Sequence, residues 1–166
     1  MRAPSLGTRL LVGGIAGFAA TLPMTIAMHR LHRLLPPAER YPLTPRELID
    51  ATATELSEPA ARDTTLLAHF LYGAGSGAVV AALAPRPSIA LGAAAGVAMW
   101  GTSYLGWIPA VGLLKPATDH PARRNALMIA AHFIWGSATA VGISEMMAAR
   151  DTILRGGIDR DVPDEP

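Results

Sequence analysis

Two histidines stand in nearly identical local sequences. His69 lies in "AHFLYGAGSG" (68–77) and His132 in "AHFIWGSATA" (131–140), where four positions are identical and the other six keep size and polarity. Imidazole titrates near neutral pH and is the commonest metal ligand, so the pair could handle protons, bind a metal ion or ligate a haem between two helices. Each ring could instead be structural, bonding a carbonyl or hydroxyl group of a neighbouring helix near a membrane interface. The sequence leaves these alternatives open.

Few other side chains offer chemistry. His29 and His32 precede a long polar loop and could join the histidine pair as ligands. Glu145 is the only carboxylate within an apolar segment, which makes it a functional candidate, although an ion pair with nearby Arg150 is the plainer explanation. Cysteine is absent, which excludes disulfides, thiolate metal sites and covalently attached haem. Because no catalytic motif is present, we expect no enzyme and no resident cofactor, with haem or a transition metal as the alternative.

The composition indicates a chain that folds in lipid. Hydrophobic residues make up 51% and charged residues only 16%, and the mean hydropathy is +0.31. Four apolar windows are long enough to cross a bilayer core of about 30 Å, at residues 10–28, 66–84, 88–114 and 126–149. The first window has a rival interpretation as a cleaved signal peptide, but it continues beyond the usual length of such a segment. We therefore predict an all-α membrane protein with four transmembrane helices in a single domain over residues 1–150, with the lipid bilayer as partner; a net charge of +1 gives no basis for nucleic-acid binding.

The repeated histidine motif predicts how the helices are arranged. "GGIAG" (13–17) precedes the first motif and "GAAAG" (92–96) precedes the second, so the chain reads as two tandem helical hairpins, a parallel repeat around a pseudo-two-fold axis along the membrane normal. An even number of helices places both termini on the same side of the membrane. The basic residues are almost equally divided between the two sides, which leaves the orientation undetermined.

Small residues four apart predict close helix contacts. This spacing allows backbones to approach in lipid, where association has no hydrophobic driving force. The contacts could lie within one bundle or support a homo-oligomer. The glycines concerned are Gly13, Gly17, Gly73, Gly77, Gly92, Gly96 and Gly136. Pro23 and Pro109 stand late in the first and third apolar windows and predict matched bends.

The loop between the first two windows contains a further helix signal. Thr44 as N-cap, Pro45 at the first helical position and Glu47 as the partner in a capping box predict a short helix over about 45–56. Its weakly apolar stripe fits an interfacial helix on the membrane surface, and a solvated loop helix is the alternative. Residues 151–166 are polar and predict a disordered tail.

The layout resembles the YagU-like family of small bacterial inner-membrane proteins. The resemblance covers residues 9–149 and rests on a first hairpin with a long Pro- and Arg-bearing loop and on "HFLYG" and "HFIWG" in the second and fourth helices. It implies the bacterial cytoplasmic membrane and supplies no catalytic residues. From the sequence we expect a structural or accessory helix-bundle protein of unassigned biochemical activity. The alternatives are a His-centred proton, metal or haem site and, more weakly, small-solute transport.

Overall fold

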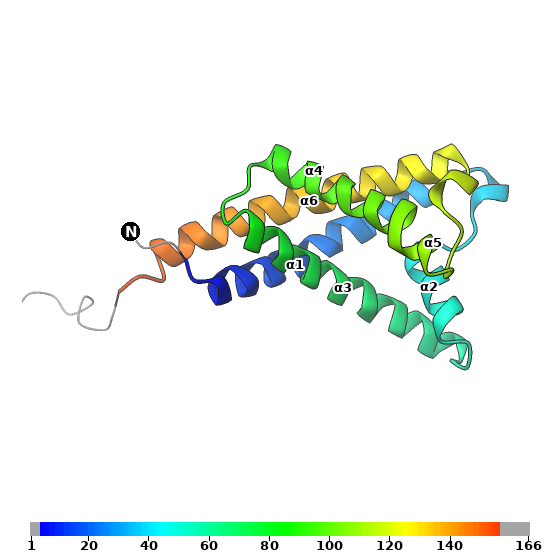
Figure 1. Ribbon diagram of the computed structural model, residues 1–166, viewed down its shortest axis with the longest axis horizontal. Coiled ribbons are helices and arrows are strands. Elements are labelled where there is room, and N and C mark those ends of the chain that lie inside the picture. The colour runs from blue at the N-terminus through cyan, green and yellow to red at the C-terminus, as the bar shows by residue number, and fades with distance from the viewer. Residues whose placement is uncertain (1–3, 157–166) are drawn as a thin grey trace, which may run out of the picture.

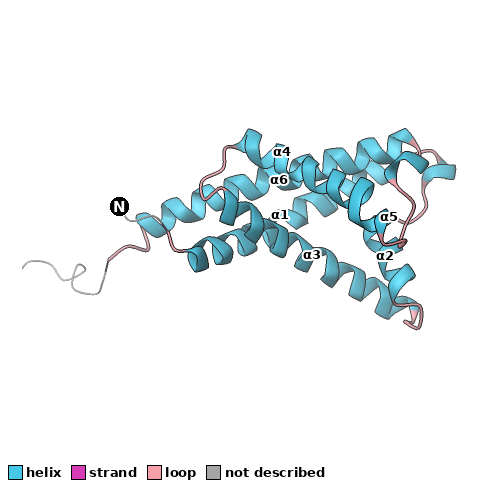
Figure 2. Ribbon diagram, in the orientation of Figure 1, coloured by secondary structure: helices cyan, strands magenta, loops and turns pink. Residues whose placement is uncertain are grey.

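The computed structural model describes residues 4–156, and within this range the chain consists of helices and loops without strands (Figure 1, Figure 2). Four helical segments are long and apolar enough to cross a membrane, which confirms the prediction of an all-α chain with four such helices. They are α1 (Leu6–His32), α3 (Glu58–Leu83), a composite third span (Ile89–Ala110) and α6 (Ala122–Asp151). A disordered tail was predicted over residues 151–166. Its first residue, Asp151, belongs to α6, and positions 157–166 lie outside the described residues.

The helices extend beyond the apolar windows because polar residues start and end them. The hydroxyl of Ser5 caps α1 by accepting a hydrogen bond from the backbone nitrogen of Thr8 at 3.2 Å. At the start of α3, Glu58 stands in the first turn and a proline follows it, both of which favour a helix N-terminus. As a result α3 begins about two turns before the window at 66–84.

The third span differs from the single helix predicted over 88–114. A helix α4 (Ile89–Gly101) is followed by a π-helical turn, η2 (Thr102–Trp107), and by one short turn, α5 (Ile108–Ala110). Pro109, which removes one backbone donor and crowds the preceding turn, stands just after this π-helical turn. In contrast, α1 is continuous across Pro23. The regular α-helix is thus interrupted near Pro109 and not at Pro23, and a matched bend at the two prolines stays a prediction.

Three helix pairs hold the molecule together. α1 packs along both α3 and α6, and α4 packs along α6. α3 and α4 do not pack along their lengths, although both are fully described. Figure 1 shows these two helices diverging toward the end of the molecule where α2 lies. The bundle is thus closed on three sides and open on the fourth.

Glycines make two of these helix contacts possible. A Cβ atom on Gly77 of α3 would lie 2.7 Å from the Cα of Gly17 in α1, and one on Gly136 of α6 would lie 3.0 Å from the backbone nitrogen of Gly96 in α4. Such distances are too short for a methyl group. All seven glycines of the small-residue motifs lie at these intramolecular crossings, Gly13, Gly17, Gly73 and Gly77 between α1 and α3, and Gly92, Gly96 and Gly136 between α4 and α6. Oligomerisation stays a prediction that would use other surfaces.

The short helix of the first loop is α2 (Thr44–Thr52). The predicted capping box is wrong, because Leu43 occupies the N-cap position and no side chain caps the helix. Glu47 instead lies 3.6 Å from Arg124 at the start of α6. α2 also ends at Thr52, before the predicted end at 56. Its partly buried apolar side chains face the open side of the bundle rather than forming an isolated stripe.

Candidate functional site

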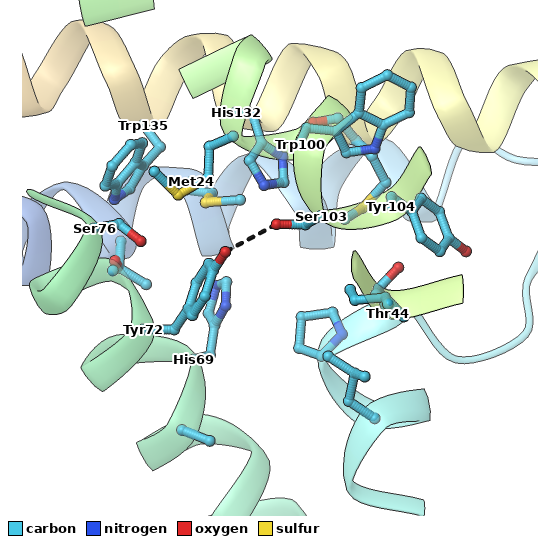
Figure 3. Close-up of a pocket in the computed structure, with 18 of the residues that line it drawn as sticks. Met24, Thr44, His69, Tyr72, Ser76, Trp100, Ser103, Tyr104, His132 and Trp135 are labelled. Atoms are coloured by element: carbon cyan, nitrogen blue, oxygen red, sulfur yellow. Dashed lines mark hydrogen bonds between the residues drawn. The ribbon is translucent and has the colours of Figure 1, made fainter. Parts of the chain in front are cut away.

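A cavity of about 220 Å³ occupies the open side of the bundle, between α3 and the third span. α1 and α6 form its floor and α2 closes one end. Residues that define this α3–α4 cavity include Met24 of α1, Leu48 of α2, His69 of α3, Trp100 of α4 and His132 of α6. Figure 3 shows side chains from these walls converging on a common space. Because five separate elements contribute, only the folded chain forms the cavity.

Both histidines of the repeated motif line the cavity, His69 from α3 and His132 from α6 (Figure 3). The Nδ1 atom of His132 lies 2.8 Å from the backbone oxygen of Met128. A carbonyl oxygen can only accept, so Nδ1 carries the proton and Nε2 of the neutral ring is left as an acceptor. Nε2 of His69 is buried and has no hydrogen-bond partner in the described part of the chain. The structure therefore brings two imidazoles with unused nitrogens to one site.

The other candidate ligands lie elsewhere. His29 is exposed on α1, and Nε2 of His32 lies 3.1 Å from the backbone oxygen of Tyr41. Neither histidine lines the cavity. Over residues 4–156 no group of three or more His, Cys, Asp or Glu side chains is arranged to hold a metal ion. The described residues thus contain no conventional multi-ligand metal centre.

Glu145 lies far along α6 and is exposed. The ion pair predicted between Glu145 and Arg150 is not formed, because Arg150 pairs with Asp151 at 2.9 Å. Asp151 also pairs with Arg86 at 2.9 Å. Asp151, which local sequence does not mark as a partner, stands at the last position of α6 and pairs with both guanidinium groups.

Aromatic side chains dominate the cavity walls. The protein's three tryptophans, Trp100, Trp107 and Trp135, all line it. The indole nitrogen of Trp135 donates to the backbone oxygen of Gly17 at 3.1 Å, whereas that of Trp100 is buried without a partner among the described residues. Among residues 4–156, no Asp, Glu, Lys or Arg side chain lines the cavity. A charged ligand would lose its hydration here without gaining a counter-charge, so the lining suits an uncharged one.

A side-chain hydrogen bond joins the two walls of the opening. The hydroxyl of Tyr72 on α3 lies 2.9 Å from the Oγ of Ser103 in η2, as the dashed line in Figure 3 shows. Tyr72 is 48% exposed, and Trp107, which also lines the cavity, is 46% exposed. Ser103 and Trp107 both belong to the π-helical turn. Sequence reasoning missed this turn, and Pro109 was its only local signal.

A buried arginine holds the first loop over the end of the cavity. The side chain of Arg124 is only 3% exposed, and its guanidinium donates to the backbone oxygens of Glu39 at 3.1 Å, Tyr41 at 2.8 Å and Pro42 at 2.7 Å. It also lies 3.4 Å from the centre of the Tyr41 ring, a cation–π contact. Arg124 reads as an interfacial basic residue in the sequence, and nothing local predicts this role.

His120 extends the same contact between the loop and α6. Its Nδ1 lies 2.9 Å from the hydroxyl of Tyr41, and its ring stacks on Tyr104 with centroids 5.3 Å apart. Burial lowers the pKa of His120, and the positive charge of Arg124 lowers it further. Burial raises the pKa of Glu47, against the opposing effect of Arg124. The groups that hold α2 in place therefore respond to pH.

α2 is also tied to the start of α3. The guanidinium of Arg46 lies 2.7 Å from Asp50 on its own helix and 2.6 Å from Glu58 on α3. These hydrogen bonds raise the pKa of Arg46. Contacts at both ends thus position α2 between the diverging helices.

Comparison of the chain with protein-family models, with curated proteins and with solved structures finds no match. The function is therefore inferred from the chemistry of the cavity.

Proposed function

We propose that this is a multi-pass membrane protein that takes a small, uncharged amphiphile from the bilayer and binds it in the α3–α4 cavity. The observation that supports this most directly is that His69 and His132, from the two copies of the repeated motif, line one cavity with unused ring nitrogens. A pocket lined by apolar and aromatic groups with a few convergent polar groups is the usual form of a small-molecule site.

The position of the opening supports a ligand that comes from lipid. The cavity lies between two membrane-length segments that do not pack on each other, and the lining residues Tyr72 and Trp107 are exposed. In a bilayer such a surface would contact acyl chains. A ligand could therefore enter sideways without crossing water.

The volume favours a small molecule over a haem. An apolar cavity of about 150 Å³ accommodates benzene, so 220 Å³ corresponds to one substituted ring rather than the four pyrroles of a porphyrin. A site for haem between His69 and His132 would need the walls to move apart. The binding of a small amphiphile needs no such movement.

The wider setting follows the resemblance to YagU-like proteins and the internal repeat. We place the protein in the bacterial cytoplasmic membrane with both termini on one side, as an internally duplicated pair of hairpins. In support, α1 begins and α6 ends at the same end of the molecule (Figure 1), and each glycine motif packs against the next long helix. α2 then lies at the opposite interface, next to the cavity.

The test compares a variant that fills the cavity with a matched control. Ala68 lines the cavity and is exposed, so Ala68→Phe should occupy the space with little effect on folding; Ala98 is exposed on α4 and outside the cavity, and Ala98→Phe is its control. Organic extracts of each purified protein are analysed by mass spectrometry, together with an optical spectrum and metal analysis. We expect a stoichiometric small molecule in the extracts of the wild type and of the control Ala98→Phe. We expect it to be absent from the extract of Ala68→Phe. Equal extracts from all three proteins would refute the proposal and favour the accessory role.

A further inference from the structure

We propose that the cavity selects a quinol, a ring with two hydroxyl groups on an apolar tail, over the corresponding quinone. This inference rests on the proposed function, because it names the class of amphiphile that the cavity takes. It concerns binding only and includes no electron transfer.

Hydrogen-bond direction carries the argument. Nδ1 of His132 uses its proton on the Met128 carbonyl at 2.8 Å, so the Nε2 atom of the neutral ring can accept but not donate. A ligand that meets this atom must therefore bring an O–H or N–H group. A quinone has only acceptor oxygens and cannot do so, whereas a quinol hydroxyl can.

Two further polar groups in the cavity wall have no hydrogen-bond partner among the described residues. The indole N–H of Trp100 is a donor only and is buried in the cavity wall without a partner within residues 4–156. Nε2 of His69 is likewise buried and unpartnered, and the neutral ring can present either a donor or an acceptor there. Because each quinol hydroxyl both donates and accepts, the hydroxyl that donates to Nε2 of His132 can also accept a hydrogen bond.

The apolar lining fits the ring and the tail. Trp100, Trp107 and Trp135 supply flat surfaces, and Met24, Met99 and Met128 supply flexible apolar ones. A carboxylic acid is disfavoured because its ionised form would find no positively charged side chain in the lining. A sterol has a single hydroxyl and therefore offers fewer hydrogen bonds than a quinol does. The open side between α3 and α4 lets an alkyl tail remain in the lipid.

The experiment measures binding of 2-decylhydroquinone, 2-decyl-1,4-benzoquinone and 1-decyl-2,5-difluorobenzene to the detergent-purified full chain. These molecules have similar size and tail and differ in hydrogen bonding. Isothermal titration calorimetry gives the affinities, with partition into protein-free micelles subtracted, and the quinol is kept reduced with ascorbate. Saturable quenching of tryptophan fluorescence by the quinone reports occupancy of the cavity, because all three tryptophans line it.

We expect the wild type to bind the quinol about five- to tenfold more tightly than the quinone, as for one additional buried hydrogen bond. His132→Leu should bring that ratio to about one, and His29→Leu, an exposed histidine outside the cavity, should leave it unchanged. The wild-type ratio is informative even if His132→Leu fails to fold.

The possible failures separate the two proposals. Equal binding of all three molecules to the wild type would overturn quinol selection and leave the amphiphile site intact. Absence of binding, combined with a different molecule extracted from the wild type but not from Ala68→Phe, would have the same meaning. Absence of binding and of any extracted molecule would overturn both.

Discussion

The substitution Gly77→Ala tests whether backbone contact between α1 and α3 holds the bundle together. The new Cβ would lie 2.7 Å from the Cα and 2.8 Å from the backbone nitrogen of Gly17. Carbon atoms in contact prefer about 3.5–4.0 Å, so the helices must separate by about an ångström. Overpacking of this kind costs about 1–3 kcal/mol. Since neither obstructing atom belongs to a flexible side chain, we expect the upper half of that range, which lowers the folding equilibrium constant by about 30- to 150-fold.

Gly75→Ala is the matched control, because a Cβ on Gly75, on the same helix, would meet nothing within 4 Å. Alanine should stabilise that position slightly through its higher helix propensity. The assay is unfolding of the detergent-solubilised protein in increasing SDS, followed by tryptophan fluorescence. Gly77→Ala should unfold at a clearly lower SDS fraction than the wild type and Gly75→Ala at the same or a higher one. If the two variants unfold together, close contact between α1 and α3 is not what stabilises the protein.

Three further predictions concern the end and the mouth of the cavity. The folded state lowers the pKa of His120, so below about pH 6.5 the unfolded chain binds more protons than the folded chain and the stability falls. The melting temperature of the wild type should therefore drop more between pH 7.5 and 5.5 than that of His120→Asn. Equal drops would show that His120 is not the group that makes the stability depend on pH. Arg124→Lys cannot keep three carbonyl contacts and the stacking on Tyr41. Amide hydrogen exchange around Tyr41, measured by mass spectrometry, should therefore accelerate at least several-fold. Unchanged exchange would show that the loop keeps its structure without Arg124. Tyr72→Phe removes the hydrogen bond to Ser103 across the opening, so stopped-flow quenching by 2-decyl-1,4-benzoquinone should be faster than in the wild type, and an unchanged rate would mean that this bond does not limit entry.

Much of the fold follows from local properties of the sequence. Hydropathy adds up along a segment, so the windows around residues 10–28 and 126–149 already predict membrane-length helices. The exact ends were less predictable, because polar residues such as those that begin α3 extend a helix without altering the apolar count. The break in the third span was missed for a similar reason, since hydropathy does not distinguish an α-helical turn from a π-helical one.

The sequence identified two residues of the candidate site, but it did not predict the cavity that they line. The repeated motif identified His69 and His132, but it could not show that both side chains line one cavity. Arg124 and His120 were missed because their partners, Tyr41 above all, lie about eighty residues earlier in the chain. Local sequence carries no signal for such contacts.

By itself, the sequence determined that the chain is helical, apolar and equipped with glycine faces on which long helices can meet. Only the tertiary structure decided which helices close and which stay apart. Small residues permit close approach but do not choose the partner, and the choice depends on packing and hydrogen bonds summed over the whole interface. The bond from Trp135 to the backbone of Gly17 joins α6 to α1 in this way. No comparable interface forms between α3 and α4, and the opening left there is the cavity.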